Sequence, residues 1–119
     1  MKKLANIRTI GSEKMIKFDT SKIYYLAHPC TGGPYCEKDN RRMESINSSY
    51  LSIVNPEIKL VRPLTIIPKD MDYDIAMDRC YKLLDACDVL LLSDGWDKSK
   101  GCLLEYEYAT KHDIEIIEL

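Results

Sequence analysis

The stretch that decides the fold is "DVLLLS", residues 88–93, because all four of its central positions are aliphatic. A strand with one face in water alternates apolar and polar residues. A strand whose two faces are both covered by helices reads instead as a continuous apolar run. The stretch therefore predicts a central strand of a parallel sheet.

Strand and helix patterns alternate around this stretch. Strands are expected at "KIYYLAH", residues 22–28, at "IKLVRP", residues 58–63, and at "IEIIEL", residues 114–119. Helices are expected from Glu37 to about Val54, from Asp72 to about Cys87, and over residues 100–112. This alternation predicts right-handed crossovers and a doubly wound α/β fold, flavodoxin-like or Rossmann-like. We expect a four-stranded parallel sheet in the order 2-1-3-4 along the chain, with helices on both faces.

The first expected helix carries an apolar stripe. Met43, Ile46, Tyr50 and Ile53 recur at spacings of three and four residues. Such spacing is typical of one side of an amphipathic helix. Asn55 and Pro56 then end the pattern.

Length and charge limit the classes of protein to consider. The 119 residues suffice for one domain, which we place at residues 21–119, after an N-terminal extension of residues 1–20. A net charge of −2 gives no electrostatic reason to expect nucleic acid or an anionic membrane as partner. No run approaches the 18 apolar residues of a membrane span. We expect a cytoplasmic protein.

The five cysteines form an odd set without a C-x-x-C pair. This pattern argues against a disulfide framework and a structural zinc site, so we expect free thiols and no metal or cofactor. Cys80, Cys87 and Cys102 recur at core spacing and are expected to be buried. A redox or metal role for Cys30 and Cys36 is a weaker alternative.

In an open α/β sheet, ligands bind outside the carboxyl ends of the strands, where the winding reverses. Here that point lies between the first and third expected strands, so the loops after "YYLAH" and "VLLLS" face one crevice. The candidate residues that these loops and strands bring together are Tyr25, His28, Gly32, Gly33, Asp94, Gly95, Trp96, Ser99 and Gly101. Trp96 is expected either to stack on a base or to pack over the crevice.

The start of the last helix suits a polar ligand. Ser99 is a candidate N-cap, and with Gly101 it offers a hydroxyl and unpaired backbone N–H groups to a phosphate or a sugar hydroxyl. Helical periodicity turns Glu105 toward the sheet and Glu107 toward solvent. A carboxylate near a helix start also benefits from the helix dipole, so spacing alone leaves both a structural and a functional role open for Glu105.

The segments "YYLAHPCTGG", "CDVLLLSDGW" and "SKGCLLEYEYA" together resemble the nucleoside 2-deoxyribosyltransferase superfamily, especially small phage and bacterial members. The signature G-W-x-x-S-x-G-x-x-x-E-x-x-x-A runs from Gly95 to Ala109. The resemblance implies that Glu105 is the nucleophile that attacks an anomeric carbon, and that Tyr25 orients its carboxylate. It also implies that Ser99 contacts the phosphate of a nucleoside 5'-monophosphate, and that a homo-oligomer, a dimer or larger, completes the site.

One position departs from the family pattern. The resemblance places the acid that protonates the leaving base at Cys80, a poor proton donor. Asp78 lies two residues away, about 200° round a helix, and would need a local irregularity to serve in its place. Asp94 and Asp97 are further candidates for this acid.

Two functions therefore compete. The first is cleavage of a nucleoside or nucleotide N-glycosidic bond, as a hydrolase or a 2-deoxyribosyl transferase, with Glu105, Tyr25 and Asp78 as catalytic residues. The second is binding of a nucleotide or a nucleotide-derived signal without catalysis, which the thiol at Cys80 favours. Both predict a small-molecule nucleoside or nucleotide partner.

Overall fold

The computed structural model describes residues 7–9 and 17–119. Its strands are β1 (Ile7–Thr9), β2 (Ile23–Ala27), β3 (Lys59–Val61), β4 (Val89–Leu92) and β5 (Glu115–Glu118). Its helices are α1 (Glu37–Val54), α2 (Pro63–Ile66), α3 (Tyr73–Asp85), the 3₁₀ helix η1 (Trp96–Lys98) and α4 (Lys100–Lys111). In the described ranges, no helix has the length and apolar character that a membrane crossing needs.

The strands form one parallel sheet in the order β1-β5-β4-β2-β3. Strands β2, β3, β4 and β5 are the four that the sequence predicts, and their order confirms the predicted 2-1-3-4 arrangement. Strand β1 was not predicted, because it lies within the extension of residues 1–20. It pairs with β5, with Ile7 opposite Ile116 and Thr9 opposite Glu118.

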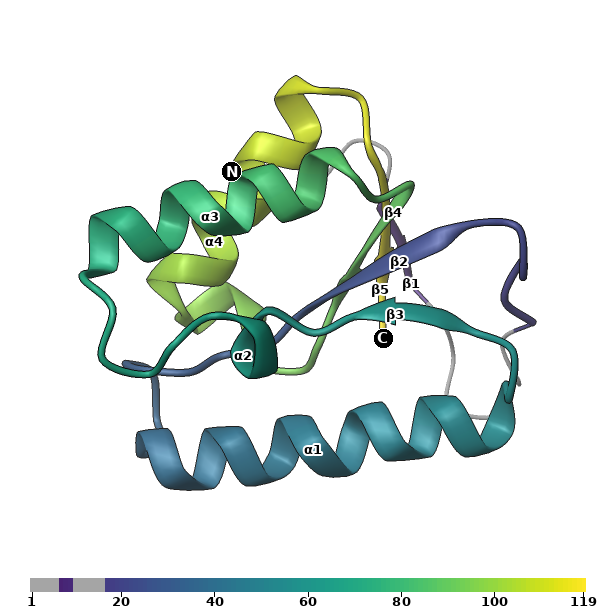
Figure 1. Cartoon of the computed structure of the whole chain (residues 1–119). Coiled ribbons are helices and arrows are strands. Elements are labelled where there is room, and N and C mark those ends of the chain that lie inside the picture. Colours follow the sequence, from purple (N-terminus) through teal and green to yellow (C-terminus); the bar gives the residue numbers. More distant parts are fainter. Residues whose placement is uncertain (1–6, 10–16) are drawn as a thin grey trace.

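Helices cover both faces of the sheet, as predicted. Helix α1 lies on one face, and α3 and α4 lie on the other (Figure 1). Alternate residues of β4 belong to the two cores: Leu90 and Leu92 pack on the α3 and α4 side, while Val89 and Leu91 pack with Leu51 of α1. Residues 89–92 are all buried, which explains the continuous apolar run in the sequence.

Side-chain caps fix the starts of two helices at the expected residues. Asp72 accepts hydrogen bonds from the backbone nitrogens of Asp74, at 3.2 Å, and Ile75, at 3.3 Å, at the start of α3. The Ser99 hydroxyl accepts from the backbone nitrogen of Cys102 at 3.3 Å and begins α4. These bonds satisfy donors that a helix N-terminus otherwise leaves unpaired.

The apolar stripe of α1 points away from the sheet. Ile46, Tyr50 and Ile53 are 59%, 64% and 76% exposed. The buried side of the helix consists instead of Asn40, Glu44, Ser48 and Leu51. Spacing identifies a stripe on α1, but the stripe does not show which side of the helix meets the sheet.

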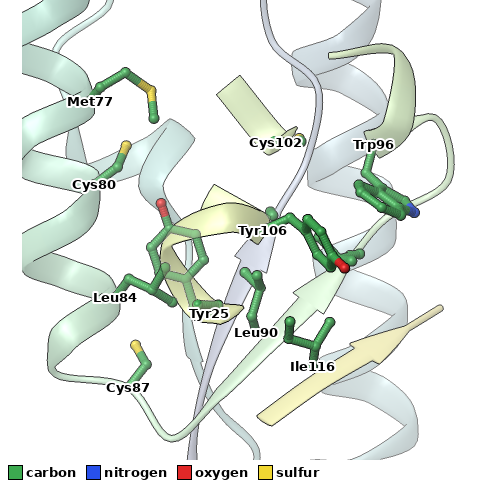
Figure 2. Packing of buried hydrophobic residues seen from close by; sticks show 13 residues of the cluster. Tyr25, Met77, Cys80, Leu84, Cys87, Leu90, Trp96, Cys102, Tyr106 and Ile116 are labelled. Carbon is green, nitrogen blue, oxygen red and sulfur yellow. The ribbon is translucent and has the colours of Figure 1, made fainter. Parts of the chain in front are cut away.

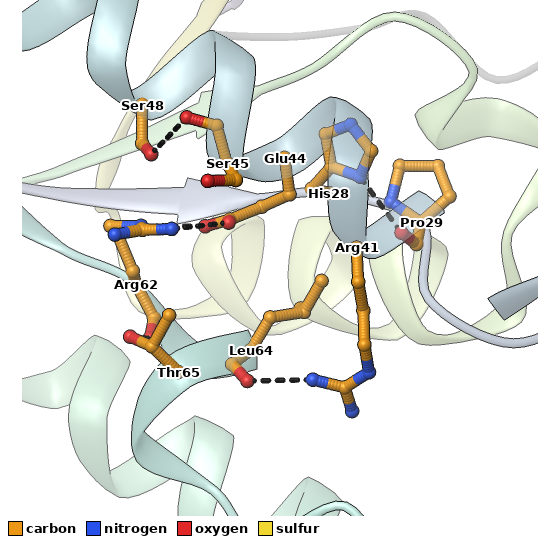
Figure 3. Close-up of polar contacts among 9 residues, drawn as sticks. All are labelled: His28, Pro29, Arg41, Glu44, Ser45, Ser48, Arg62, Leu64 and Thr65. Carbon is orange, nitrogen blue, oxygen red and sulfur yellow. Dashed lines mark hydrogen bonds and ion pairs between the residues drawn. The ribbon is translucent and has the colours of Figure 1, made fainter. Parts of the chain in front are cut away.

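Polar bonds set the rotation of α1. Glu44 is 2% exposed and receives two hydrogen bonds from Arg62, which follows β3, at 2.7 and 3.0 Å (Figure 3). The Asn40 side chain donates to the backbone oxygens of Cys30 and Tyr35. A buried carboxylate needs such a partner, so the two bonds to Arg62 hold this side of α1 inward.

The Glu44–Arg62 ion pair yields a prediction about stability. Replacing Arg62→Gln leaves the Glu44 carboxylate buried without a cation, which should lower the free energy of unfolding by about 3 kcal/mol. Urea unfolding followed by circular dichroism measures the change. The matched control is Lys82→Gln, which breaks the exposed Lys82–Asp78 pair and should cost less than about 0.5 kcal/mol. Equal losses in the two variants would contradict the role of the buried pair.

Candidate functional site

A cavity of about 340 Å³ opens at the carboxyl end of β2. Four parts of the chain line it: the end of β2 and its loop, the start of α1, the segment from α2 to α3, and the start of α4. The lining residues of chemical interest are His28, Cys30, Glu37, Arg41, Lys69, Tyr73, Cys80, Ser99, Gly101, Cys102 and Glu105. This size and mixed lining are typical of a small-molecule site.

Glu105 lies on the cavity wall with its side chain turned inward from α4. It is 6% exposed, and Cys102, Tyr106 and Ala109 on the same side of the helix are also buried, whereas Glu107 is exposed. These placements confirm the orientation that helical periodicity predicts. Within the described part of the chain, no ion pair includes Glu105, so its carboxylate is buried without a cation.

The Tyr25 hydroxyl, from β2, donates a hydrogen bond to Glu105. Burial raises the pKa of Glu105 from its ordinary value of 4.5 to about 7, and the bond from Tyr25 opposes that rise. Burial, together with the nearby Glu105 charge, raises the pKa of Tyr25 well above 10. Tyr25 therefore stays a neutral donor and holds one carboxylate oxygen in place.

Thiols surround this pair. Figure 2 shows the Tyr25 hydroxyl pointing toward Met77 and Cys80 of α3. Burial, and then the charge of Glu105, raise the pKa of Cys80 to about 11 and that of Cys102 to about 12. Both groups are neutral thiols near neutral pH. Compared with them, Glu105 has the pKa that lies nearest to neutral pH, so it is the group that gains or loses a proton there.

The N-terminus of α4 forms another part of the wall. Ser99 and Gly101 both line the cavity, as predicted, and the first backbone N–H groups of α4 lie at this end. A Cβ atom at Gly101 would meet the Tyr73 hydroxyl at 3.7 Å and the Met77 sulfur at 3.8 Å. These are ordinary contact distances, so Gly101 lies against α3 beside a helix end that favours anions.

His28 also lines the cavity, from the end of β2. Its Nδ1 lies 2.8 Å from the backbone oxygen of Pro29 (Figure 3). Because a carbonyl oxygen only accepts hydrogen bonds, we assign the proton to Nδ1. Nε2 takes no part in this bond.

Sequence reasoning missed the basic side of the cavity. Arg41 of α1 lines it, and its guanidinium donates from Nε to Glu37 at 2.8 Å and from Nη1 to the backbone oxygen of Leu64 at 2.8 Å. Lys69, between α2 and α3, adds a second cation. No spacing motif marks either residue, and only the observed rotation of α1 separates Arg41 from the exposed Arg42.

The two loops expected to share a crevice do lie together, but several of their residues are outside the cavity. A Cβ atom at Gly33 would meet the backbone oxygen of Lys98 at 3.4 Å, and one at Gly95 would meet the Pro29 ring at 3.7 Å. The predicted ligand-binding residues that do not line the cavity are Gly32, Gly33, Asp94, Gly95 and Trp96. The loops pack on each other beside the cavity instead of forming its walls.

Two further candidates have other surroundings. Trp96 is buried next to Tyr106, and its indole nitrogen donates to Glu118 at 2.7 Å, so it packs in the core and not over the cavity. Asp78 is exposed, pairs with Lys82 at 3.2 Å and does not line the cavity. The α3 residues that line the cavity together with Glu105 are Tyr73, Ala76, Met77 and Cys80.

The five cysteines are free, with Cys80, Cys87 and Cys102 buried as predicted. Cys30 is half-buried and Cys36 is exposed. Over residues 7–9 and 17–119, no group of three or more His, Cys, Asp or Glu side chains is placed to hold a metal ion.

Comparison with known families gives one match. A family model described as "Domain of unknown function (DUF4406)" matches residues 22–118, which include every strand from β2 onward and all of the cavity-lining residues. No curated protein and no solved structure matches the chain.

The raised pKa of Glu105 predicts a pH-dependent stability. Between pH 4.5 and about 7 the unfolded chain releases this proton and the folded chain keeps it, so wild-type stability falls as pH rises through this window. Glu105→Gln keeps a hydrogen-bonding oxygen and removes the charge. The variant should match the wild type at pH 4 and exceed it at pH 8 by on the order of 3 kcal/mol.

Urea unfolding of both proteins at a series of pH values measures this difference. The control is Glu107→Gln on the exposed side of α4, whose difference from the wild type should stay constant with pH. A constant difference for Glu105→Gln as well would contradict a buried, uncompensated carboxylate.

Proposed function

The chain belongs to the DUF4406 family, and we propose that it cleaves the N-glycosidic bond of a nucleoside or nucleotide, with Glu105 as nucleophile. The observation that carries the proposal is the buried Glu105 carboxylate, held by the Tyr25 hydroxyl on the wall of a ligand-sized cavity. A buried carboxylate without a cation costs stability. Proteins tolerate such a loss of stability at positions where a reaction needs the carboxylate.

The reaction follows from the chemistry of a carboxylate at an anomeric carbon. That carbon gains oxocarbenium character as the bond to the base breaks, and a nearby carboxylate stabilises the positive charge and then captures it as a glycosyl ester. Water resolves the ester in a hydrolase, and a second base resolves it in a transferase. The hydrogen bond from Tyr25 fixes one carboxylate oxygen and leaves the other for attack.

The α4 N-terminus supports a polar sugar or a 5'-phosphate as the other part of the substrate. Ser99 accepts one backbone hydrogen bond as the helix cap, and its hydroxyl can also donate a hydrogen bond to a ligand oxygen in place of the Cys102 thiol. The first backbone N–H groups of α4 and the helix dipole favour an anion at the same place. Glu105 lies on the same wall, one and a half turns further along α4. The sugar would therefore lie between the α4 N-terminus and Glu105.

The resemblance to nucleoside 2-deoxyribosyltransferases supports the same assignment. In that superfamily a helix glutamate is the nucleophile, and a tyrosine on the first strand orients it. The Tyr25–Glu105 hydrogen bond is consistent with these roles. The second candidate function, nucleotide binding without catalysis, is favoured by the exposed position of Asp78 and by the thiol of Cys80 in the cavity.

Release of free base tests the proposal. Purified wild-type protein, incubated with a panel of nucleosides and nucleoside 5'-monophosphates, should release base detectable by chromatography. Glu105→Gln should lower the rate by at least about a thousandfold, because an amide cannot form the glycosyl ester. Calorimetric binding of a nucleotide without base release would instead support the binding function, and wild-type release no faster than that of Glu105→Gln would reject catalysis.

The pH profile gives a second test. The attacking group is the carboxylate, so kcat/KM should rise with pH through about 7, the pKa of Glu105. The bond from Tyr25 lowers that pKa, so Tyr25→Phe should move this limb to higher pH and reduce the plateau rate by about tenfold or more. Tyr24→Phe is the matched control, because Tyr24 lies on the opposite face of β2. An unshifted limb in Tyr25→Phe would contradict the positioning role.

A further inference from the structure

The cavity holds few groups able to protonate a departing base. Apart from Glu105, the carboxylate among its lining residues is Glu37, which is already paired with Arg41. Burial raises the pKa values of the thiols of Cys80 and Cys102 to about 11 and 12, which makes them weak proton donors near neutral pH. The carboxylates and thiols of the cavity are therefore poor donors, which leaves His28 as a candidate acid and the cations of the cavity as a second means of stabilising the leaving group.

Arg41 places a guanidinium in the same cavity, where it is paired with Glu37. Its bonds to Glu37 and to Leu64 use Nε and Nη1 and hold the plane of the guanidinium; Figure 3 shows the bond to Leu64. The Arg41 side chain also hydrogen-bonds to the Cys30 thiol. Burial raises the pKa of the Cys30 thiol and Arg41 opposes that rise, so the guanidinium lies beside Cys30. Cys80 is in turn within electrostatic reach of Cys30 and of Glu105.

Arg41 lines the cavity from α1, whereas Ser99 and Glu105 line it from the α4 side. A nucleotide with its sugar at Glu105 and its phosphate toward Ser99 would direct its base toward Arg41. Lys69 lines the same cavity and adds to the positive potential there.

We infer that Arg41 stabilises the leaving base as an anion, so that the preferred substrates carry bases with a carbonyl group at the position where cytosine and adenine carry an amino group, such as uracil or hypoxanthine. This inference rests on the proposed function. A Glu105 carboxylate oxygen bonds to the anomeric carbon as the C–N bond breaks, and the electron pair of that bond leaves with the base. The base anion spreads its charge onto the carbonyl oxygen and later takes a proton from water.

The hydrogen-bonding pattern of the bases explains the expected preference. Guanidinium groups pair well with carbonyl oxygens and ring nitrogens that accept hydrogen bonds, and poorly with the amino groups of adenine and cytosine, which donate them. A fixed donor aimed where negative charge develops acts mainly on the transition state. The amino bases leave readily only when they are protonated first, and the carboxylates and thiols of the described cavity are poor donors for that step.

The first test uses wild-type protein and two matched pairs of 5'-monophosphates. Inosine and adenosine nucleotides share the purine shape, and uridine and cytidine nucleotides share the pyrimidine shape, with the exocyclic oxygen replaced by an amino group in each pair. The oxygen-bearing member should have a kcat/KM at least about tenfold higher at pH 7.5. Equal rates, or faster release of adenine or cytosine, would overturn the inference.

The second test uses variants of Arg41. Arg41→Gln should lower kcat for uridine 5'-monophosphate by about a hundredfold with a smaller change in KM, because the charge develops in the transition state. The loss should be smaller for the 5-fluorouracil nucleotide, whose base is a better leaving group. Arg41→Lys should keep part of the activity, and the exposed Arg42→Gln should keep all of it. Thermal melting shows whether each variant is folded.

The outcomes distinguish a failure of the proposed function, cleavage of the glycosidic bond, from a failure of the inference about Arg41. Wild-type protein that releases no base from any nucleotide would reject the proposed function and this inference together. Base release that is insensitive to Arg41→Gln, or a change in KM alone, would reject the inference and leave the proposed function standing. His28→Gln could lower the rate of base release equally for all four nucleotides while Arg41→Gln stays fully active. That result would show that His28 protonates the base, and it would overturn the role of Arg41.

Discussion

Every strand of this sheet runs parallel to its neighbours, so each chain connection must return across a face of the sheet before the next strand begins. The connection from β2 to β3 places α1 on one face, and the connections from β3 to β5 place α3 and α4 on the other. The starts of α1 and α4 therefore flank the carboxyl end of β2 from opposite sides. The cavity, with Arg41 on one side and Glu105 on the other, is a product of this reversal of winding.

The parts of this arrangement that are encoded locally could be predicted. The aliphatic run of β4, the caps at Asp72 and Ser99, and the inward turn of Glu105 each depend on residues within a few positions of one another. The rotation of α1 could not be predicted, because Arg62, which fixes Glu44 inward, is eighteen residues away. Arg41 was missed for the same reason, since its place in the cavity follows from that rotation. Trp96 was predicted to lie at the crevice. Its side chain packs in the core instead, because it donates to Glu118, which is 22 residues away in the sequence.

Among residues 17–119, two carboxylates are buried, and they are stabilised in different ways. Glu44 has a bidentate cation and serves to hold α1, while Glu105 has a neutral phenol and is left near the midpoint of its titration at neutral pH. A buried glutamate therefore has a structural role at Glu44 and a proposed chemical role at Glu105. A full ion pair at Glu105 would stabilise the fold but would also lower the reactivity of the carboxylate. The hydrogen bond from Tyr25 orients the group and leaves it basic.

The pairing of β1 with β5 has a consequence for the order of folding. These two strands are neighbours in the sheet, with Ile7 opposite Ile116, although they are further apart along the sequence than any other paired strands. A contact between such distant segments has the highest loop-closure cost in the sheet. The pairs β2–β3, β2–β4 and β4–β5 close shorter loops, so the sheet can form from β2 to β5 before β1 docks on its edge.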